Sequence, residues 1–380
     1  MNLELTEEQQ LLQKSVRDFA ESEVRPRAKE LDETGHFPHD LFNKAAELGL
    51  TGVAFPEEEG GAGFDHLAYT IVIEEISRCC ASTGVILSVQ NSLFCDPIHR
   101  YGTDEQKKKF LLPFTRGQKI GCYALTEPQA GSNAAALQTR AVKKGDTYVI
   151  NGTKAWITNG GVADASIVYV NTDPGRGERG ITAIIVEKGT PGFKVGKEEK
   201  KLGISATACC ELNFADCAVP VANRIGNEGE GYKVALSTLD GGRIGIAAQA
   251  TGIAQGAFEA ALKWAKERMA FGQPIAQLQA IQFMLADMAT EIDAARLLVR
   301  KAAWKQDSGG RFSQEAATAK LFASEMATRV THKAIQIHGG YGYSREYPVE
   351  RAYRDARITE IYEGTSEIQR LVIASWVLKQ

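Results

Sequence analysis

The chain has 380 residues, which exceeds the usual size of one hydrophobic core and predicts two or three packed subdomains. Apolar residues make up 44% and charged residues 24%, an ordinary globular composition. The formal net charge of -3 gives no general attraction for phosphate backbones, so nucleic acid is not an expected partner.

No membrane helix is predicted, because the longest apolar stretches, such as residues 84–89, end well short of a bilayer span. The N-terminal residues lead into an acidic amphipathic helix, unlike a signal or transit peptide. We expect a cytoplasmic protein of a bacterium, or a mitochondrial matrix protein in processed form. The odd number of cysteines, 7, and the scattered histidines predict reduced thiols and no metal site.

Residues 1–118 predict an N-terminal helical domain. Thr6-Glu7-Glu8-Gln9 forms a capping box before apolar residues at helical spacing. Further helices are predicted over residues 41–48, 67–80 and 104–114, and the glycine-rich residues 59–63 predict a loop.

Residues 119–228 predict a middle β-domain, because short runs rich in Val, Ile, Thr and Tyr alternate there with turn signals. The predicted strands are residues 121–125, 147–150, 155–158, 167–171 and 181–186. Asn151-Gly152 predicts a hairpin turn. The segment has too little helix for parallel β-α-β winding.

Residues 229–380 predict a C-terminal helical bundle. Helical periodicity returns in three long blocks from Gly231 onward. A final helix is predicted after Thr365, where Ser366-Glu367-Ile368-Gln369 reads as a second capping box. The order of helices, sheet and helices indicates an α+β multidomain protein.

Glu363, in Ile361-Tyr362-Glu363-Gly364-Thr365, is a candidate base because it directly precedes a predicted helix N-terminus. Backbone amides and the helix dipole there would favour its ionised form, and Gly364 would let a ligand approach the backbone. A solvated acid in a first helical turn is the alternative.

The loop from Tyr123 to Asn133 could hold a flat heterocycle and its phosphates through free amides and hydroxyls, or it could be an ordinary surface turn. Trp156 on a following strand could cover an aromatic face, or simply pack in the core. Asp240-Gly241-Gly242-Arg243 predicts a turn at a helix start, suited to an anionic ligand or to a plain interhelical connection.

Together these segments resemble the acyl-CoA dehydrogenase family over nearly the whole chain, from Leu5 to Leu378. Six motifs in the family's order carry the resemblance. They are residues 123–132, 156–158, 239–249, 268–272, 336–342 and 361–370. The resemblance implies an N-terminal helical domain, a middle β-barrel-like domain and a C-terminal four-helix bundle, assembled as a homotetramer with FAD as cofactor.

The resemblance also assigns residues to roles. It implies that the flavin ring contacts Tyr123, Leu125, Thr126, Trp156, Ile157 and Thr158, with Gly131 and Ser132 in the same loop and Ser132 near CoA. Adenylate and pyrophosphate contacts across a subunit interface are implied for Arg268, Phe271, Gln279, Gln336, Gly339 and Gly340, while Thr365 and Glu367 would close over the cofactor. Substrate contacts are implied for Asp240, Gly241, Gly242, Arg243 and Gly364.

Glu363 takes the position of the catalytic base in this resemblance. It would remove the α-proton of an acyl-CoA while its own amide and a flavin ribityl hydroxyl stabilise the enolate oxygen. The pKa of the carboxyl would rise as the acyl chain expels water. Some members carry the base near the Asp-Gly-Gly-Arg segment instead, but Gly242 has no side chain. The β-hydride would pass to the flavin and the electrons to an electron-transfer flavoprotein.

The stretch Leu87 to Leu93 resembles the short-chain, butyryl-CoA members, and residues 84–87 lack the arginine of the decarboxylating branch. Two residues depart from the family pattern: Asn133 stands where Asp is usual, and Ser205 where Arg is common. The alternatives are a branched-short-chain dehydrogenase, an acyl-CoA oxidase on the same scaffold, and a non-catalytic acyl-CoA or flavin-binding protein.

Overall fold

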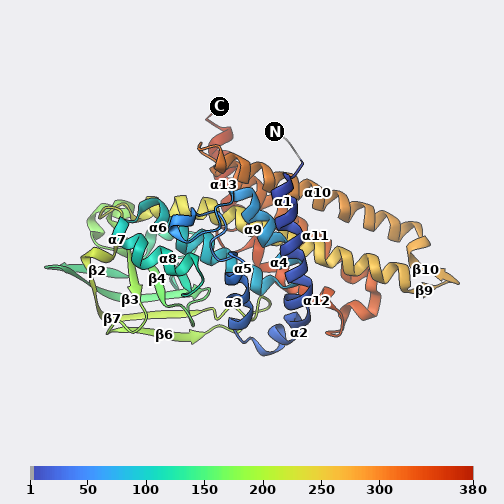
Figure 1. Cartoon of the computed structure of the whole chain (residues 1–380), viewed down its shortest axis with the longest axis horizontal. Coiled ribbons are helices and arrows are strands. Elements are labelled where there is room, and N and C mark those ends of the chain that lie inside the picture. Colours follow the sequence, from blue (N-terminus) through green and yellow to red (C-terminus); the bar gives the residue numbers. More distant parts are fainter. Residues whose placement is uncertain (1–3, 380) are drawn as a thin grey trace.

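Residues 4–379 are described in a computed structural model of the chain. Helices, then a sheet, then longer helices follow one another along the chain, which confirms the α+β multidomain prediction (Figure 1). The sheet lies at one end of the molecule and the long helices extend to the other. The domain boundaries drawn after residues 118 and 228 stay a prediction.

The N-terminal region is helical, and its first helix begins where the capping box predicts. Thr6 Oγ1 accepts the Gln9 amide at 3.2 Å, and the Gln9 side chain accepts the Thr6 amide at 3.1 Å. The helices are α1 (Glu7–Phe19), α2 (Arg25–Thr34), α3 (His39–Glu47), α4 (His66–Cys79), α5 (Ala81–Ser88), α6 (Asp96–Tyr101), α7 (Asp104–Gln106) and α8 (Leu112–Thr115).

Helices α5 and α6 are joined without a break by a π-helical segment, Val89–Cys95. Its residues are all buried, and the segment packs against helix α9 (Gly231–Glu267). Short π-helical insertions occur frequently at functional sites because the extra residue turns side chains to new directions. This one presents Leu93 toward α9, beside Glu363.

The middle region forms one sheet from β1 (Gly121–Ala124), β2 (Arg140–Lys144), β3 (Thr147–Ile157), β4 (Ala165–Asn171), β5 (Ile181–Glu187), β6 (Phe193–Glu198), β7 (Cys210–Pro220) and β8 (Arg224–Ile225). The strand order is β6-β7-β3-β2-β4-β5-β8, with β1 parallel to β4. A single residue pair, Arg140 with Asn171, joins β2 to β4. The sheet therefore consists of two groups of strands with a narrow junction.

The hairpin turn predicted at Asn151-Gly152 is wrong. Strand β3 runs through both residues, and the pairing with β7 shifts register between Ile150 and Gly152, as at a β-bulge. Asn151 instead exchanges hydrogen bonds with Asp216 on β7. Gly152 has φ 148°, and a β-carbon there would crowd Thr139, so glycine serves the bulge rather than a turn.

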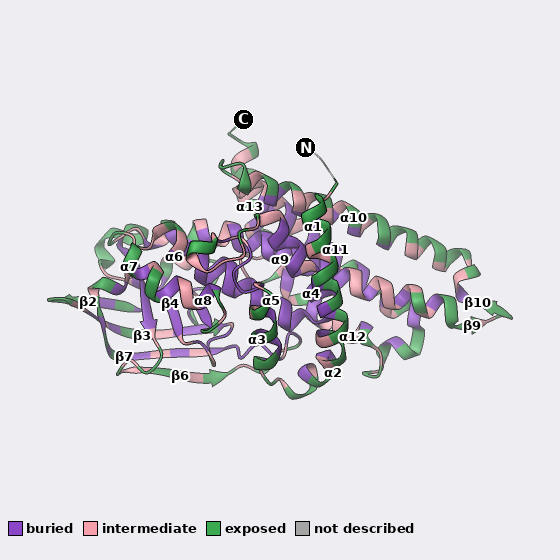
Figure 2. Cartoon of the chain, viewed as in Figure 1, coloured by how far each residue is buried: buried purple, intermediate pink, exposed green. Residues whose placement is uncertain are grey.

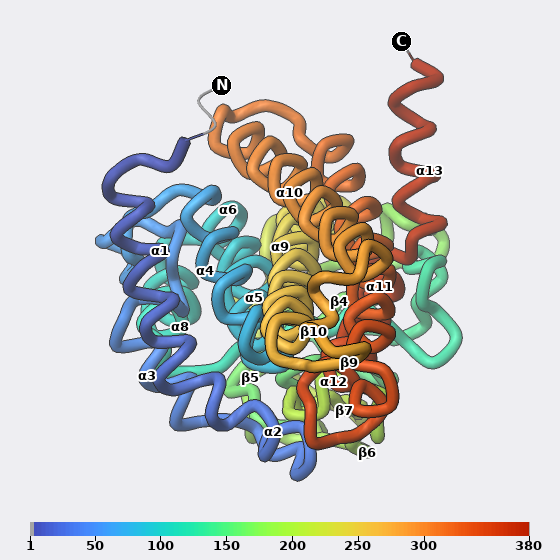
Figure 3. The backbone as a smooth tube through the Cα atoms, turned by 90° about the vertical axis from the view of Figure 1, so that its right-hand side faces the viewer, coloured from blue at the N-terminus to red at the C-terminus, as the bar shows by residue number. Residues whose placement is uncertain are grey.

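The C-terminal region is built around α9, with α10 (Gln279–Asp307) and α11 (Ser313–His338) alongside it (Figure 3). Nearly the whole middle of α9 is buried, whereas α10 is exposed along much of its length (Figure 2). The two-stranded hairpin of β9 (Met269–Ala270) and β10 (Gln273–Pro274) connects α9 to α10, and α12 (Pro348–Arg357) and α13 (Ser366–Val377) follow α11. The predicted long helical blocks are confirmed.

Within residues 4–379, no helix combines the length and apolar character that crossing a bilayer requires. All seven cysteines are buried and unpaired.

Candidate active site

Glu363 lies in a tight turn between a short 3-10 segment (Ile358–Glu360) and α13. Its backbone has φ 53°, and that of Gly364 has φ 94°. A left-handed backbone at a glutamate costs free energy and persists only where the surroundings enforce it, as happens often at active sites. Among the described residues, the Glu363 amide donates no hydrogen bond, so it is free to serve as an oxyanion donor.

The Glu363 carboxyl is directed into the protein. The residue as a whole is partly exposed, but its Oε2 atom is buried and has no hydrogen-bond partner. Desolvation raises the pKa of Glu363 to about 7, against the opposing influence of Lys320 and Arg243.

This result corrects the expectation that a helix terminus keeps Glu363 ionised. Helix α13 begins at Ser366, after the turn, with Thr365 as its N-cap and Thr365 Oγ1 accepting the Ile368 amide. The predicted capping box at Ser366 is therefore wrong: the N-cap is Thr365, the third helical residue is Ile368, which cannot complete a box, and the Ser366 hydroxyl is buried without a partner. Burial outweighs the helix dipole because the carboxyl has left water and gained no donor.

Residues 240–243 lie inside helix α9, not in a turn before a helix as predicted. Two glycines in a helix are unfavourable by propensity, but packing overrides this where a neighbour needs the space. A β-carbon on Gly242 would come closer than 3.0 Å to Glu363 Oε2 and to Leu93 Cδ2. A β-carbon on Gly241 would meet only the end of Gln306, at 3.7 Å. Gly242 therefore makes room for the carboxyl, and Gly241 faces elsewhere.

Arg243 is held beside the site by a chain of polar contacts. Its guanidinium donates to Asp240 at 2.6 Å, and Asp240 in turn accepts from Ser313 at 2.5 Å. Arg243 is buried, and its Nε atom has no partner. Burial raises the pKa of Asp240, whereas Arg243 opposes that rise. One guanidinium N–H group of Arg243 is thus buried without an acceptor.

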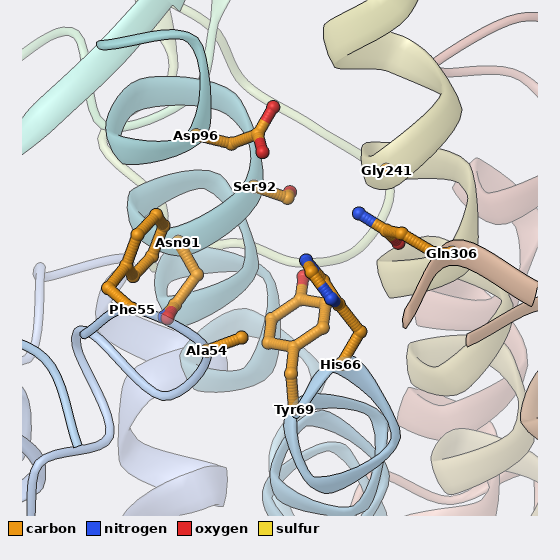
Figure 4. A pocket seen from close by; sticks show the side chains of 9 residues that line it. All are labelled: Ala54, Phe55, His66, Tyr69, Asn91, Ser92, Asp96, Gly241 and Gln306. Atoms are coloured by element: carbon orange, nitrogen blue, oxygen red, sulfur yellow. The ribbon is translucent and has the colours of Figure 1, made fainter. Parts of the chain in front are cut away.

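One turn farther along α9, Gly245 faces a pair of hydroxyl groups that the sequence did not predict. A β-carbon there would lie closer than 3.0 Å to Tyr69 Oη and Ser88 Oγ, which are 2.9 Å apart and hydrogen-bonded. Tyr69 also lines a pocket of about 20 Å³, room for one water molecule (Figure 4). Gly242 and Gly245 lie on one face of α9, and this spacing was the available sequence signal.

Lys320 on α11 is a second residue that the sequence did not single out. It is completely buried, and its ammonium donates to the Gly364 carbonyl at 2.7 Å. Gln369 on α13 donates to the same carbonyl at 2.8 Å. Two side chains from separate helices thus fix the turn that carries Glu363.

The residues assigned to the flavin ring come together at the ends of β1 and β3. The Ala155 amide donates to the Thr126 carbonyl at 2.9 Å, which places Thr126 beside Trp156. Trp156 has φ 61° and is 58% exposed, so it is not a simple core tryptophan. Leu125 and Ile157 are buried, Tyr123 and Thr158 are partly buried, and Gly131 and Ser132 are exposed in the loop.

A fully buried ion pair, which the sequence did not predict, holds the loop of residues 127–139 in place. Lys154 donates to Glu127 at 2.7 Å and to the Leu125 carbonyl at 3.1 Å. Glu127 also accepts the amides of Gln138 and Thr139 at 2.6 and 2.9 Å. The carboxylate therefore ties both ends of the 127–139 loop to strand β3.

The residues assigned to the adenylate form a separate cluster at the far end of the helices. Arg268, Gly339 and Gly340 line one hollow together with the aromatic rings of Trp264, His338 and Tyr341. Phe271, with φ 52°, is 89% exposed on the hairpin beyond it. Gln279, Gln336 and Glu367 are exposed, and Thr365 is partly buried at the start of α13.

The two clusters do not meet within one chain. The β9–β10 hairpin projects at the end of the molecule opposite the sheet (Figure 1). The expectation that one cofactor contacts both clusters across an interface between copies stays a prediction.

Of the two departures from the family pattern, Asn133 is exposed in the flavin-side loop and Ser205 is tied to helix α2. Ser205 Oγ donates to Asp32 at 3.0 Å, and Arg354 on α12 holds the same carboxylate at 2.6 Å. Ser205 thus secures a loop between α2 and α12.

Comparison with known proteins covers the whole chain. Residues 6–118, 122–217 and 229–378 match the N-terminal, middle and C-terminal domains of acyl-CoA dehydrogenase. The chain is 52% identical over 379 residues to the short-chain specific acyl-CoA dehydrogenase of Clostridium acetobutylicum, with 100% of both chains covered.

Two solved structures have nearly the same fold as this chain over its whole length. Butyryl-CoA dehydrogenase from Megasphaera elsdenii has a TM-score of 0.98 at 48% identity, covering 100% of both chains. A chain in the structure of the electron transferring flavoprotein of Acidaminococcus fermentans has a TM-score of 0.99 at 49% identity, again over 100% of both chains. The chain belongs to the acyl-CoA dehydrogenase family.

Proposed function

We propose that the protein is an FAD-dependent dehydrogenase that converts a short-chain acyl-CoA of the butyryl type to the trans-2-enoyl-CoA, with Glu363 as the base. The observation that carries this proposal is the buried, unpartnered Oε2 of Glu363 against Gly242. A carboxylate without hydrogen-bond donors, in a site that excludes water, is a stronger base than one in solution.

The chain's own groups account for the proton step. Glu363 takes a proton from C2 of the acyl group, and its free backbone amide donates to the thioester oxygen where negative charge develops. We assign the second donor, a cationic one, to the unpartnered Nε–H of Arg243, beside Asp240. The positive φ at Glu363 holds carboxylate and amide in this arrangement.

The residues present fit FAD. Trp156 and Phe271 are large, exposed aromatic residues with a left-handed backbone. Gly131, Gly339 and Gly340 have open space where another residue would carry its β-carbon. Tyr123, Leu125, Thr126, Trp156, Ile157 and Thr158 would hold the ring system, and the Arg268 cluster of a second copy would hold the adenylate. When bound, FAD supplies the acceptor for the β-hydride.

The side chains of Tyr69 and Ser88, which lie against Gly245 and form a wall there, favour a short acyl chain. Gly242 lies against the carboxyl of Glu363, and Gly245 lies against the hydrogen-bonded hydroxyls of Tyr69 and Ser88. The two glycines are only about 4.5 Å apart along the helix axis. An acyl group with C2 at Glu363 therefore meets this buried pair after few carbons. The short-chain and butyryl-CoA relatives support the same preference.

The electron acceptor that we propose is an electron-transfer flavoprotein, supported by the similar chain in the structure of such a protein. The two separated cofactor clusters favour a homo-oligomer, and the family resemblance a homotetramer. A cytoplasmic or mitochondrial matrix location stays a prediction.

The test is a panel of acyl-CoA esters mixed anaerobically with the FAD-loaded protein, with flavin bleaching as the signal. Bleaching fastest with butyryl-CoA and weak with octanoyl-CoA is expected. Bleaching only with long or dicarboxylic esters would refute the substrate assignment, and none with any ester would refute the dehydrogenase. Rapid reoxidation by air would favour the oxidase alternative.

A further inference from the structure

Lys320 occupies a position where a charged side chain is costly. It is 0% exposed on α11, and burial lowers its pKa to about 7. Moving an ammonium group out of water is unfavourable unless it gains specific partners, and a buried lysine without a task is rare. Its hydrogen-bond partner is not a carboxylate but the carbonyl of Gly364, at 2.7 Å.

The same face of α11 holds both ends of the segment that carries Glu363. Four residues beyond Lys320, Ser324 donates to the Thr359 carbonyl at 2.8 Å, at the beginning of that segment. Lys320 donates a hydrogen bond to the other end of the segment, at the Gly364 carbonyl. The left-handed backbone of Glu363 lies between these contacts and needs such support.

We propose that Lys320 is a positioning residue for Glu363, resting on the proposed function: its ammonium anchors the Glu363-Gly364 turn and acts electrostatically on the buried carboxylate. The anchoring fixes where the carboxyl meets C2 of the substrate. The charge makes the ionised carboxylate easier to form in a site where burial opposes it.

Other charged and titratable groups face this pair and are left in place by the test. Arg243 on α9 also favours ionised Glu363, while Glu360 and Glu367 favour charged Lys320. The charge of Glu363 also acts on three tyrosines, from α4, β1 and its own turn: Tyr69, Tyr123 and Tyr362. The burial of these tyrosines raises their pKa, so they stay neutral across the range of interest.

The experiment compares Lys320→Gln and Lys320→Met with wild type, using the rate of flavin bleaching by butyryl-CoA in the FAD-loaded protein from pH 5.5 to 9.5. Glutamine loses the charge but keeps an N–H donor for the Gly364 carbonyl, whereas methionine loses both. Wild-type bleaching in the same series establishes the proposed function independently of Lys320.

Both variants should shift the rising limb of the pH profile upward by roughly one pH unit, because a nearby cation no longer favours the carboxylate. The shift lies at the low end for an opposite charge, since Lys320, with its pKa of about 7, is itself only partly charged where Glu363 titrates. Lys320→Met should also have a lower plateau at high pH than Lys320→Gln. Lys333→Gln, which removes a lysine of α11 paired with Asp287 and Glu291, is the control and should leave the limb in place.

An unchanged limb in both Lys320 variants would overturn the electrostatic role, and equal plateaus would overturn the anchoring role. If neither variant retained flavin or cooperative unfolding, Lys320 would be a structural residue and the proposal would also fail. Absence of bleaching in wild type would instead contradict the proposed function.

Discussion

Gly242 and Glu363 lie so close that a β-carbon on the glycine would come within 3.0 Å of the carboxylate Oε2. The glycine comes from the middle of α9 and the glutamate from the turn before α13, so two distant segments depend on each other. The position of the carboxyl is thereby coupled to the absence of one side chain.

Gly242→Ala should therefore reduce the rate of flavin bleaching by about 10²-fold, since a displacement near 1 Å at a catalytic group has that effect. The free energy of unfolding should stay the same or increase slightly, because alanine is favoured over glycine within a helix by about 0.5–1 kcal/mol. Rapid mixing and urea unfolding measure the two effects.

The matched variant is Gly241→Ala, whose new β-carbon meets only the end of Gln306. Its loss of rate should be at least tenfold smaller. Equal losses in both variants would show that helix α9 as a whole, and not the contact with Glu363, is responsible.

Tyr69→Ala should extend the range of acyl chains, because it removes the wall at Gly245 and opens the space into the adjoining pocket (Figure 4). The ratio of kcat/KM for hexanoyl-CoA to that for butyryl-CoA should rise about tenfold or more, as one methylene in an apolar pocket is worth about 1–3 kcal/mol. Tyr69→Phe keeps the ring and should change this ratio much less. The idea fails if the ratio is the same in all three proteins.

Lys154→Met should destabilise the protein by about 3–5 kcal/mol, because it leaves the buried Glu127 carboxylate without its counter-ion. The loop with Thr126 should loosen, and the bound flavin should dissociate more readily. Urea unfolding and the flavin-to-protein absorbance ratio measure the change. Adding Glu127→Gln should restore part of the stability, since glutamine can still accept the loop amides; no recovery would count against the charge argument.

The pH profile of kcat/KM for wild type should rise with pH through a value near 7. Glu363 must be ionised to accept a proton, and burial raises its pKa to about 7, so the active fraction grows as pH increases through that value. Steady-state rates with butyryl-CoA between pH 5 and 9 check this. A limb near pH 4.5 would mean that the carboxyl is solvated in the free enzyme.

Sequence patterns predicted most of the fold because the long amphipathic helices and the capped start at Thr6 are local features. They failed at Asn151-Gly152 and at residues 240–243, where glycine serves a long-range need: a bulge against β7 in one case and room for Glu363 in the other. Local propensity cannot distinguish these uses from turns.

The candidate site follows the same division. The motif identifies Glu363, but the helix dipole alone predicts an ionised carboxylate in the free protein, and the burial that raises its pKa cannot be seen in a sequence. Lys320, Tyr69 and Lys154 were missed because single buried polar residues in helices or strands carry no pattern of their own; only contact with distant segments gives them a role.

The most direct measurement is the single-turnover reaction of Glu363→Gln with butyryl-CoA. The variant should keep bound flavin and the perturbation of its spectrum by a CoA ligand, while bleaching slows by at least about 10²–10⁴-fold, the usual contribution of a general base. Bleaching at the wild-type rate would contradict the assignment of Glu363 as the group that removes the proton.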